Sequence, residues 1–232
     1  MSWPAPYRRV DELDPMPYET AWPDLRGVTG RVDVHSLIAF YVLAQRFRGM
    51  YLEFGVGAGR SAVAAMRANR RYNPEGIDRF FLFDSFEGLP ALEGRDEGSK
   101  VFQQGQYAFS VTDVRAKLEK HGVWDEARVT FVPGFFEQSL PAFDLARFGG
   151  RFAPIVHVDV DLHASARQVL DFVTPLLRQG SVILFDDWNV FDASWQKGER
   201  AAAREWLVAH PGYNLESYAK YGFHGEAFIV HC

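Results

Sequence analysis

The sequence predicts an α/β fold: a mostly parallel seven-stranded sheet with helices on both faces and an antiparallel hairpin at the C-terminus. Segments with helical periodicity alternate with short apolar runs along most of the chain, which is the pattern of repeated βα units. The runs are apolar throughout, as expected for strands that a parallel sheet buries on both faces. With 232 residues, the chain can bury roughly 70% of its unfolded surface, which is enough for one core.

The elements are expected to follow one another as a helix, five βα units and the terminal hairpin. The first helix begins at Val34, and the last ends before Pro211 and Gly212, which do not continue a helix. The stretch 88–110 has no periodicity, and a loop of this length is usually functional, so we expect it to cover the acceptor. Strands are expected at 50–54, 80–83, 128–132, 155–159, 181–185, 213–218 and 227–231, and helices at 34–43, 61–69, 111–121, 164–178 and 199–210.

Two regions are expected along the chain. Residues 1–30 contain five prolines between positions 4 and 23, which excludes a long helix there and favours an extended arm or cap. The arm is expected either to pack on the body or on a second subunit, or to cover the acceptor site. Residues 31–232 are expected to form a single domain, and we expect the protein to be a homo-oligomer, a dimer or a tetramer.

The charge, the cysteine count and the apolar runs of the sequence exclude several kinds of partner and location. Lys and Arg total 25 against 30 Asp and Glu, which gives a formal net charge of −5, so neither nucleic acid nor an anionic membrane is an expected partner. The one cysteine, Cys232, permits no intrachain disulfide. The sequence contains neither a signal-peptide pattern nor a run of 18 apolar residues, and we expect a cytoplasmic protein.

A glycine-rich loop after the first strand indicates a nucleoside ligand. Gly55, Gly57 and Gly59 allow a sharp turn and let a ligand approach the backbone, at the sheet edge where open parallel sheets bind ligands. Arg60 stands where the dinucleotide pattern needs its third glycine, which disfavours NAD. Glu53 before the loop favours a cationic ligand such as S-adenosylmethionine. A tight βα turn without a ligand is the alternative.

Acidic residues follow the other strands. Asp84 ends the second strand and is placed to accept hydrogen bonds from two ribose hydroxyls. Asp159 and Asp161 end the fourth strand, where residues two apart share a face, and Asp186 and Asp187 end the fifth. If these two strands are neighbours, four carboxylates converge, and a hard cation such as Mg²⁺, Mn²⁺ or Ca²⁺ would offset their repulsion. Helix-capping or solvated acids are the alternative.

Five segments together resemble a known family. They are LEFGVGAGRS at 52–61, FDSFEGLP at 83–90, GFFEQSLP at 134–141, DVDL at 159–162 and ILFDD at 183–187. In this order and spacing, the chain resembles the macrocin O-methyltransferase family over about residues 33–210. The resemblance implies a Rossmann-like class I methyltransferase fold, S-adenosylmethionine and Mg²⁺ as cofactors, and a hydroxyl of a sugar or glycoside as the acceptor.

The resemblance also implies roles for individual residues. Asp159, Asp186 and Asp187 would hold the metal, and Asp161 would be the general base. The chain departs from the family's usual Tyr-Glu pair with a His-Ala pair that begins at His163, so His163 is a second candidate for proton transfer or substrate contact. The residues expected to bind the donor are Glu53, Gly55, Gly57, Gly59, Ser61, Asp84, Ser85, Gly134 and Phe135.

Three other functions stay open at this point. A catechol-type or other small-molecule O-methyltransferase would share the metal chemistry, although Leu162 stands where catechol-type enzymes carry a lysine. A non-catalytic module that binds the nucleoside would not need the aspartates. A nicotinamide oxidoreductase is disfavoured by Arg60 in the glycine loop.

Overall fold

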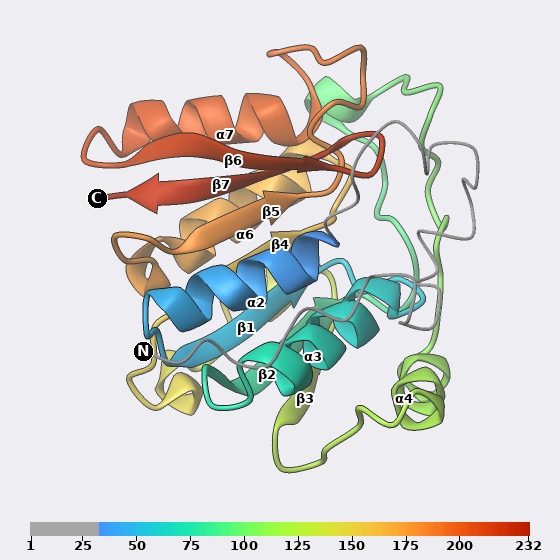
Figure 1. The fold of residues 1–232 in the computed structure, drawn as a ribbon. Helices are drawn as coiled ribbons and strands as arrows, with labels where there is room; N and C mark the ends of the chain where they lie inside the picture. Colours follow the sequence, from blue (N-terminus) through green and yellow to red (C-terminus); the bar gives the residue numbers. More distant parts are fainter. Residues whose placement is uncertain (1–32) are drawn as a thin grey trace, which may run out of the picture.

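The strands lie where the apolar runs predict them in the computed structural model, which describes residues 33–232; the arm expected at 1–30 lies outside the described residues. Every residue of the interior strand β1 is buried, as expected for a strand that is covered on both faces. The strands are β1 (Gly49–Phe54), β2 (Ile77–Asp84), β3 (Val129–Pro133), β4 (Ile155–Val158), β5 (Val182–Phe185), β6 (Asn214–Tyr221) and β7 (Gly225–His231) (Figure 1).

The seven strands form one mostly parallel sheet in the order β3-β2-β1-β4-β5-β7-β6. The strands β1 to β5 pair in parallel, and β7 runs antiparallel to both β5 and β6. The strand order reverses between β1 and β4, which is where open sheets of this kind bind their ligands. The predicted fold class is confirmed. The strands that precede the two aspartate pairs, β4 and β5, are neighbours, which meets the condition for the four carboxylates to converge.

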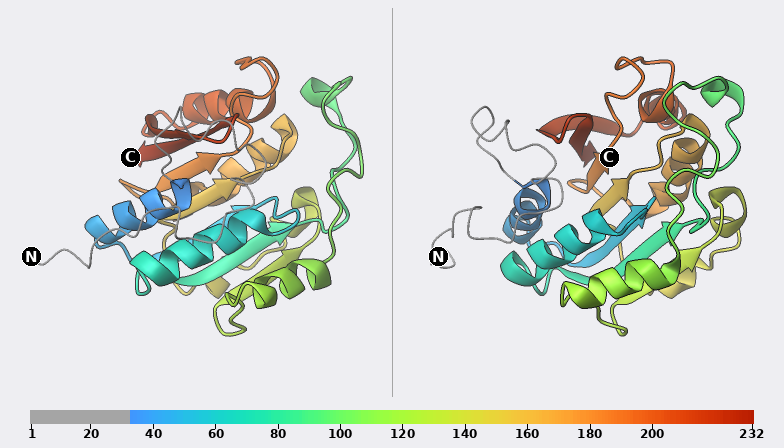
Figure 2. Two further views of the ribbon diagram at one scale, coloured as in Figure 1. Left: turned by 45° about the vertical axis from the view of Figure 1, so that its right-hand side comes forward. Right: turned by 90° about the vertical axis from the view of Figure 1, so that its right-hand side faces the viewer.

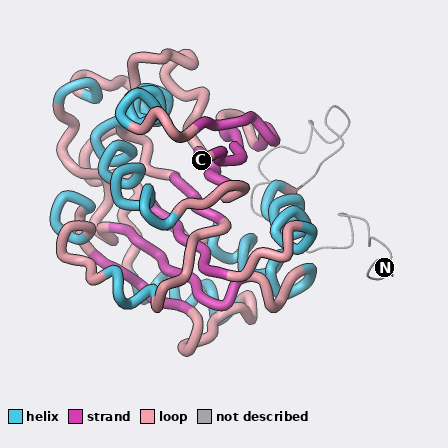
Figure 3. The backbone as a smooth tube through the Cα atoms, turned by 90° about the vertical axis from the view of Figure 1, so that its left-hand side faces the viewer, coloured by secondary structure: helices cyan, strands magenta, loops and turns pink. Residues whose placement is uncertain are grey.

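Helices cover both faces of the sheet (Figures 2 and 3). On one face, α2 (Val34–Ala44), α3 (Arg60–Tyr72) and α4 (Val111–Lys120) pack over a core that includes Tyr51 and Leu82. On the other face, α5 (Phe136–Ser139), α6 (His163–Val173) and α7 (Gly198–Ala209) pack over a core that includes Phe54 and Phe83. Three short 3-10 helices complete the described elements: η3 (Gly94–Asp96), η4 (Leu145–Phe148) and η5 (Thr174–Leu176).

The bounds of several elements differ from those expected, and two of these differences have a clear physical cause. The helix expected at 164–178 ends at Val173, and η5 follows it with Pro175 in its first turn. Proline has no backbone N–H to donate and its ring crowds the preceding turn, so the α-helix does not continue through Pro175. The strand expected at 80–83 begins earlier, at Ile77, with Asp78 and Arg79 exposed, and these polar residues hide the start of the strand in the apolar pattern.

In the described part of the chain, none of the helices combines the length and the apolar character that crossing a membrane requires.

Candidate active site

The ends of the parallel strands are held side by side by backbone hydrogen bonds that continue the sheet. The N–H of Gly55 donates to the carbonyl of Phe83, and the N–H of Asp159 donates to the carbonyl of Phe54, each at 2.9 Å. Asp186 is joined in the same way to Val158, also at 2.9 Å. The glycine loop and both aspartate pairs therefore meet at one edge of the sheet, as the sequence predicts.

A cavity of about 640 Å³ opens at this edge. Its floor is formed by the strand ends, and one wall is formed by the 88–110 loop, which rises past the carboxyl ends of the strands towards α6 and α7 (Figure 2). The volume is in the range of small-molecule sites. Ten of the residues expected to bind donor or metal or to act in catalysis line the cavity: Gly55, Gly57, Ser61, Asp84, Ser85, Phe135, Asp159, Asp161, Asp186 and Asp187.

The glycine loop passes so close to the end of β4 that its first residue has no room for a side chain. Gly55 has a φ of +80°, and a Cβ atom built there would lie 1.7 Å from the carbonyl oxygen of Asp159. Gly57 also has a positive φ, +46°, but no atom lies within 4 Å of its Cβ position. Gly55 therefore serves the close packing of two strand ends, whereas Gly57 leaves open space beside the cavity.

Asp84 fastens the glycine loop to the end of β2. Its Oδ2 accepts hydrogen bonds from the backbone N–H groups of Val56 (2.6 Å) and Gly57 (3.0 Å), and its Oδ1 accepts one from Phe86 (2.7 Å). A carboxylate has about four lone-pair sites, of which these bonds occupy two on Oδ2 and one on Oδ1. Asp84 can therefore accept one ribose hydroxyl on Oδ1 while it orders the loop that approaches the donor.

Glu53 does not line the cavity, in contrast to the expectation that it faces the donor. Its side chain is fully buried under the loop, where its two oxygens accept hydrogen bonds from Tyr51 Oη and Ser61 Oγ, each at 2.6 Å. Burial raises the pKa of Glu53 in spite of these bonds and of the nearby His157. The carboxylate thus connects β1 to the start of α3, a structural role that its position before the loop does not distinguish from ligand binding.

Two of the expected glycines also lie away from the cavity lining. Gly59 precedes α3 with a φ of +73°, and a Cβ there would lie 2.8 Å from a methyl carbon of Val114 on α4. Gly134 has a φ of +124°, and its N–H continues the sheet by donating to the Asp84 carbonyl at 2.9 Å. Both glycines serve packing and chain direction, and Phe135 is the residue of that turn that reaches the cavity.

Asp159 and Asp161 reach the cavity by a different route from the one expected. The strand β4 ends at Val158, so the two residues do not share a strand face. Instead, the N–H of Leu162 donates to the carbonyl of Val160 at 2.5 Å across Asp161, which has a φ of +61°. This is the pattern of a γ-turn, a strained conformation for a residue with a side chain. The turn aims a buried Asp161 side chain into the cavity.

The aspartates at the cavity floor are protonated more readily than ordinary carboxyls. Burial, together with the charges of Asp186 and Asp187, holds the pKa of Asp159 well above its usual value. Burial and the neighbouring Asp187 do the same to Asp161. Burial raises the pKa of Asp187 to about 6 although Asp161 donates a hydrogen bond to it. Carboxyls that face one another out of water in this way must share protons or bind a cation.

The donor set suits a hard divalent cation, although the carboxyls are not arranged as an assembled metal site. All the converging groups are oxygen ligands, which Mg²⁺ and Ca²⁺ prefer. Oδ2 of Asp187 is buried and has no hydrogen-bond partner among the residues that the structure describes, and such an atom is expected to find one. Within residues 33–232, no three His, Cys, Asp or Glu side chains are arranged as a metal site.

Glu199 is a functional candidate that the sequence did not indicate. It lies in the first turn of α7, is fully buried, and accepts hydrogen bonds from the backbone N–H groups of Asp187 (3.0 Å) and Val160 (3.4 Å). One carboxyl thus holds both aspartate-bearing segments in place. Burial, then the charges of Asp187 and Asp186, raise the pKa of Glu199 well above its usual value. A glutamate in a first helical turn is common, so no local signal could have identified it.

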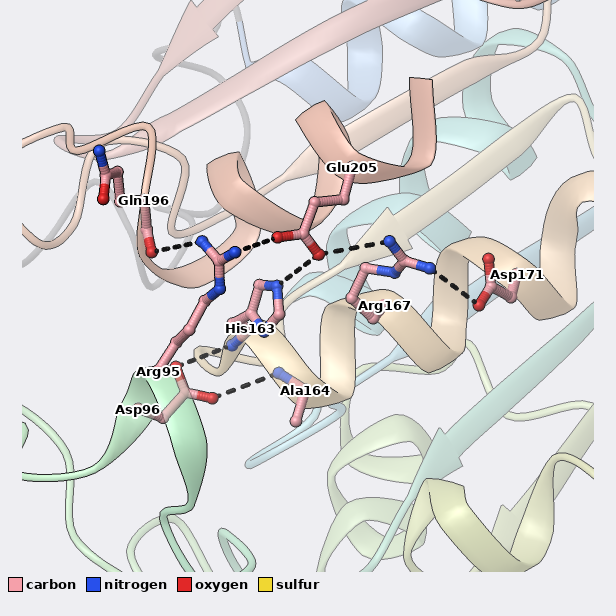
Figure 4. Close-up of polar contacts among 8 residues, drawn as sticks. All are labelled: Arg95, Asp96, His163, Ala164, Arg167, Asp171, Gln196 and Glu205. Carbon is pink, nitrogen blue, oxygen red and sulfur yellow. Dashed lines mark hydrogen bonds and ion pairs between the residues drawn. The ribbon is translucent and has the colours of Figure 1, made fainter. Parts of the chain in front are cut away.

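His163 does not face the aspartates. It is the first residue of α6, and its Nε2 lies 3.0 Å from Glu205 Oε2 on α7 (Figure 4). The cavity is lined by its neighbours Leu162 and Ala164 and not by His163. The expectation that His163 contacts substrate or moves the proton is therefore not met by this geometry.

Comparison with known proteins identifies the family. Residues 22–206 match the family described as Macrocin-O-methyltransferase (TylF). This chain belongs to the macrocin O-methyltransferase family. It is therefore an O-methyltransferase, an enzyme of the class that uses S-adenosylmethionine.

Relatives of this methyltransferase agree with the family. A curated protein from Streptomyces olivaceus, described as 8-demethyl-8-(2,3-dimethoxy-alpha-L-rhamnosyl)-tetracenomycin-C 4'-O-methyltransferase, is 29% identical over 192 residues, which cover 79% of this chain and 71% of the relative. The solved structure of the calicheamicin methyltransferase CalS11 has a TM-score of 0.68 at 23% identity, with 93% of this chain and 86% of that chain covered. The O-methyltransferase NovP gives 0.66 at 19% identity, with coverage of 85% and 78%. The two structures show the class I O-methyltransferase fold.

Asp187→Asn is expected to stabilise the metal-free methyltransferase at neutral pH. Because the pKa of Asp187 rises from 3.8 to about 6 on folding, the folded state binds more protons than the unfolded chain between these values. The free energy of unfolding therefore falls as the pH rises through this window. Asparagine removes that loss and can still hydrogen-bond Asp161, so the variant should be more stable at pH 7.5 by up to about 3 kcal/mol.

Urea unfolding in EDTA at pH 7.5 and pH 4 measures this difference. The difference in free energy of unfolding between the variant and the wild type should shrink towards pH 4, where wild-type Asp187 is protonated in the folded state. Adding Mg²⁺ should raise the stability of the wild type more than that of the variant. A variant that is less stable than the wild type at both pH values would contradict the raised pKa of Asp187.

Proposed function

We propose that this methyltransferase transfers a methyl group from S-adenosylmethionine to a hydroxyl of a sugar or glycoside, with a Mg²⁺ ion held by Asp159, Asp186 and Asp187. The observation that carries the proposal is the convergence of four aspartates and the glycine loop on one cavity. A module that only binds the donor would have no use for buried carboxyls whose mutual repulsion opposes folding. The family assignment also favours turnover, because the family is one of O-methyltransferases.

The donor side of the proposal depends on the glycine loop and Asp84. S-adenosylmethionine, when bound, supplies the methyl group from its sulfonium centre. Asp84 accepts a ribose hydroxyl with the lone pair on Oδ1 that the backbone hydrogen bonds leave free. Gly57, with open space at its Cβ position, lets the donor approach the backbone. The acidic edge of the sheet suits a cationic donor better than a pyrophosphate.

The acceptor side depends on Asp161. A sugar hydroxyl is a poor nucleophile, and a bound Mg²⁺ supplies the Lewis acidity and the template that such a hydroxyl needs. In its ionised form, which a bound cation would favour, Asp161 accepts the hydroxyl proton on a carboxylate oxygen, which is the part of a general base. The hydroxyl oxygen takes the methyl group as the bond from carbon to sulfur breaks, and S-adenosylhomocysteine leaves. The γ-turn fixes the Asp161 side chain at the cavity floor, so the reacting groups are aligned before reaction and the entropic cost of alignment is reduced.

The acceptor class is inferred from the relatives and from the cavity wall. The Streptomyces olivaceus relative is described as a methyltransferase of a rhamnosyl group. In this chain, the 88–110 loop brings Phe102, Gln106 and Tyr107 to the cavity, a mixture of flat apolar surface and polar groups that suits a sugar ring with its hydroxyls. Burial, and then the negative charges of Asp161 and Asp187, raise the pKa of the Tyr107 phenol. This part of the loop therefore lies close enough to the aspartates to interact with them.

A methyl-transfer screen tests the proposal. The purified full chain is given S-adenosylmethionine labelled in the methyl group and a panel of free sugars, glycosides and catechols, with Mg²⁺ or with excess EDTA. We expect label on a glycoside or sugar only with Mg²⁺, lost on chelation and restored by added Mg²⁺. S-adenosylhomocysteine should raise the melting temperature in both buffers, and NAD should not, because only a ligand of the folded state shifts it.

Each arm of the screen has its own contrary outcome. Undiminished turnover after exhaustive chelation would exclude the metal role. Turnover of catechols alone would favour the catechol-type alternative. A melting-temperature rise with NAD alone would overturn the assignment of the donor.

A further inference from the structure

The 88–110 loop supplies the cap of a helix to which it does not belong. Helix α6 begins at His163, and its N-cap residue Leu162 has no side-chain acceptor to offer. Asp96 of η3 fills this role from outside: its Oδ1 accepts the N–H of His163 at 3.0 Å and its Oδ2 accepts the N–H of Ala164 at 3.2 Å (Figure 4). The first N–H groups of a helix have no partner within the helix. Two of those of α6 are therefore satisfied by the loop.

Asp96 is also unusually buried for an acidic loop residue. Only 2% of its surface is exposed, whereas its neighbours Glu93, Arg95 and Glu97 are exposed. A carboxylate is seldom buried unless it is fully hydrogen-bonded, and the two helix N–H groups, with the positive end of the helix dipole, satisfy it. The contact is therefore a specific anchor of the loop on α6.

A second contact ties the same segment of the loop to α7. Arg95 lies 2.6 Å from Oε1 of Glu205, while His163 (3.0 Å) and Arg167 (3.3 Å) approach Oε2 of the same carboxylate (Figure 4). Arg95 also donates to the backbone carbonyl of Gln196 at 3.2 Å. Burial opposes ionisation of Glu205, but the hydrogen bond of His163 and the two arginines outweigh it and lower its pKa. His163 thus belongs to the anchor of the loop.

The anchored end of α6 is also one end of the catalytic turn. His163 follows Leu162, whose N–H closes the γ-turn over Asp161. The other end of the turn is fixed by Glu199, which accepts the N–H of Val160. A strained turn persists only where its surroundings hold it. On its C-terminal side, the turn is restrained by the start of α6, where Ala166 N–H donates to the Leu162 carbonyl and Asp96 accepts the next free N–H groups. Asp96 belongs to the loop that we expect to cover the acceptor.

We propose that Asp96 is a positioning residue: it caps α6 from the 88–110 loop and so makes the placement of Asp161 depend on the order of that loop. The proposal rests on the proposed function for the reaction that Asp161 serves, although the cap itself can be tested without turnover. When the loop is seated, the acceptor wall and the base are both in place. When it is released, α6 loses its cap and the turn before it loses one of its two fixed ends.

Hydrogen–deuterium exchange tests the cap directly in the full chain without ligands. In the wild type, the amides of His163 and Ala164 should be protected although they lie in the first turn of a helix. In Asp96→Ala, exchange of these two amides should rise at least tenfold, and the 88–110 loop should exchange faster. In Asp96→Asn, which keeps one oxygen acceptor, the amides should be intermediate. Asp144→Ala, which removes a capping aspartate from η4 in the β3–β4 connection, should leave both amides protected.

Kinetics tests the consequence for the reaction. Asp96→Ala should lower kcat about tenfold, the effect expected for loss of a helix cap in the active arrangement, with the donor KM within about twofold because the glycine loop is untouched. Asp96→Asn should recover part of kcat. Arg95→Ala alters an exposed side chain and keeps the cap made by Asp96. It should raise hydrogen exchange of the loop more than exchange of the His163 and Ala164 amides. This variant keeps the test possible if Asp96→Ala fails to fold.

The outcomes separate this inference from the proposed function. Equal exchange of the His163 and Ala164 amides in wild type and Asp96→Ala would overturn the cap, whatever the enzyme methylates. A confirmed exchange difference with kcat unchanged in Asp96→Ala would overturn the positioning role. If no glycoside is methylated by any variant, the exchange result still decides the cap, and the proposed function fails by itself.

Discussion

Asp161→Asn is expected to lower kcat for methyl transfer by roughly 10²–10⁴-fold, the range for loss of a general base. The substitution keeps the shape of the side chain in its turn but removes the oxygen that accepts the proton. Asparagine also tolerates a positive φ better than most residues do, so the turn should survive. Binding of S-adenosylhomocysteine, measured by its effect on the melting temperature, should stay close to wild type because Asp84 and the glycine loop are unchanged.

Two variants serve as controls for this result. Asp159→Asn removes an anionic ligand of the proposed Mg²⁺ site, so high Mg²⁺ should recover part of its lost rate, whereas Asp161→Asn should not respond. His163→Ala should keep most of kcat at saturating donor, because the imidazole lies against Glu205 and not in the cavity. Recovery of Asp161→Asn by excess Mg²⁺ would make Asp161 a metal ligand. A full loss in His163→Ala with near-normal Asp161→Asn would return His163 as the base.

The fold was largely predictable because its signals are local and repeated. Every expected strand is present, and the positions that end the parallel strands, such as Gly55, Asp84 and Asp186, do meet at one edge. This follows from the rule that parallel strands joined by right-handed crossovers place their carboxyl ends together. The positions of the strand ends alone therefore predict that Gly55, Asp84, Asp159, Asp186 and Asp187 meet. The other donor residues that line the cavity, Ser61, Ser85 and Phe135, are expected from the family resemblance.

The remainder of the site depends on contacts that no local pattern encodes. Asp96 caps a helix 67 positions along the chain, and Glu199 holds Val160 from 39 positions away. Neither residue differs, in its sequence neighbourhood, from an ordinary exposed acid. The period of two of a strand predicts that Asp161 faces the cavity, but the side chain reaches the cavity through a γ-turn after β4 ends at Val158. Such a turn has no clear sequence signal. Glu53 has the expected position before the glycine loop, but its side chain lies under the loop and not in the cavity. The sequence cannot separate these two cases, since an acid before a glycine loop can serve either packing or ligand binding.

Gly55→Ala is expected to lower the free energy of unfolding by about 4 kcal/mol or more, in the range that only severe steric or strained substitutions reach. The added Cβ would lie 1.7 Å from the carbonyl oxygen of Asp159 and 2.7 Å from its carbonyl carbon, at a φ of +80°. Both neighbours are backbone atoms of a strand end that is itself hydrogen-bonded to Phe54, so no flexible side chain can move aside. The strand ends β1 and β4 must separate, which displaces Asp159 from the aspartate cluster.

Gly57→Ala is the matched control, because Gly57 lies in the same loop with a positive φ but with open space at its Cβ position. Gly57→Ala should lower the free energy of unfolding by only about 1 kcal/mol, the lower end of the range for an L residue in the left-handed region. Urea unfolding of both variants in EDTA measures the difference, and the folded fraction of Gly55→Ala should also require more Mg²⁺ for methyl transfer, since Asp159 moves with the strand end. Equal stability losses in the two variants would show that the backbone conformation, and not the contact with Asp159, dictates glycine at position 55.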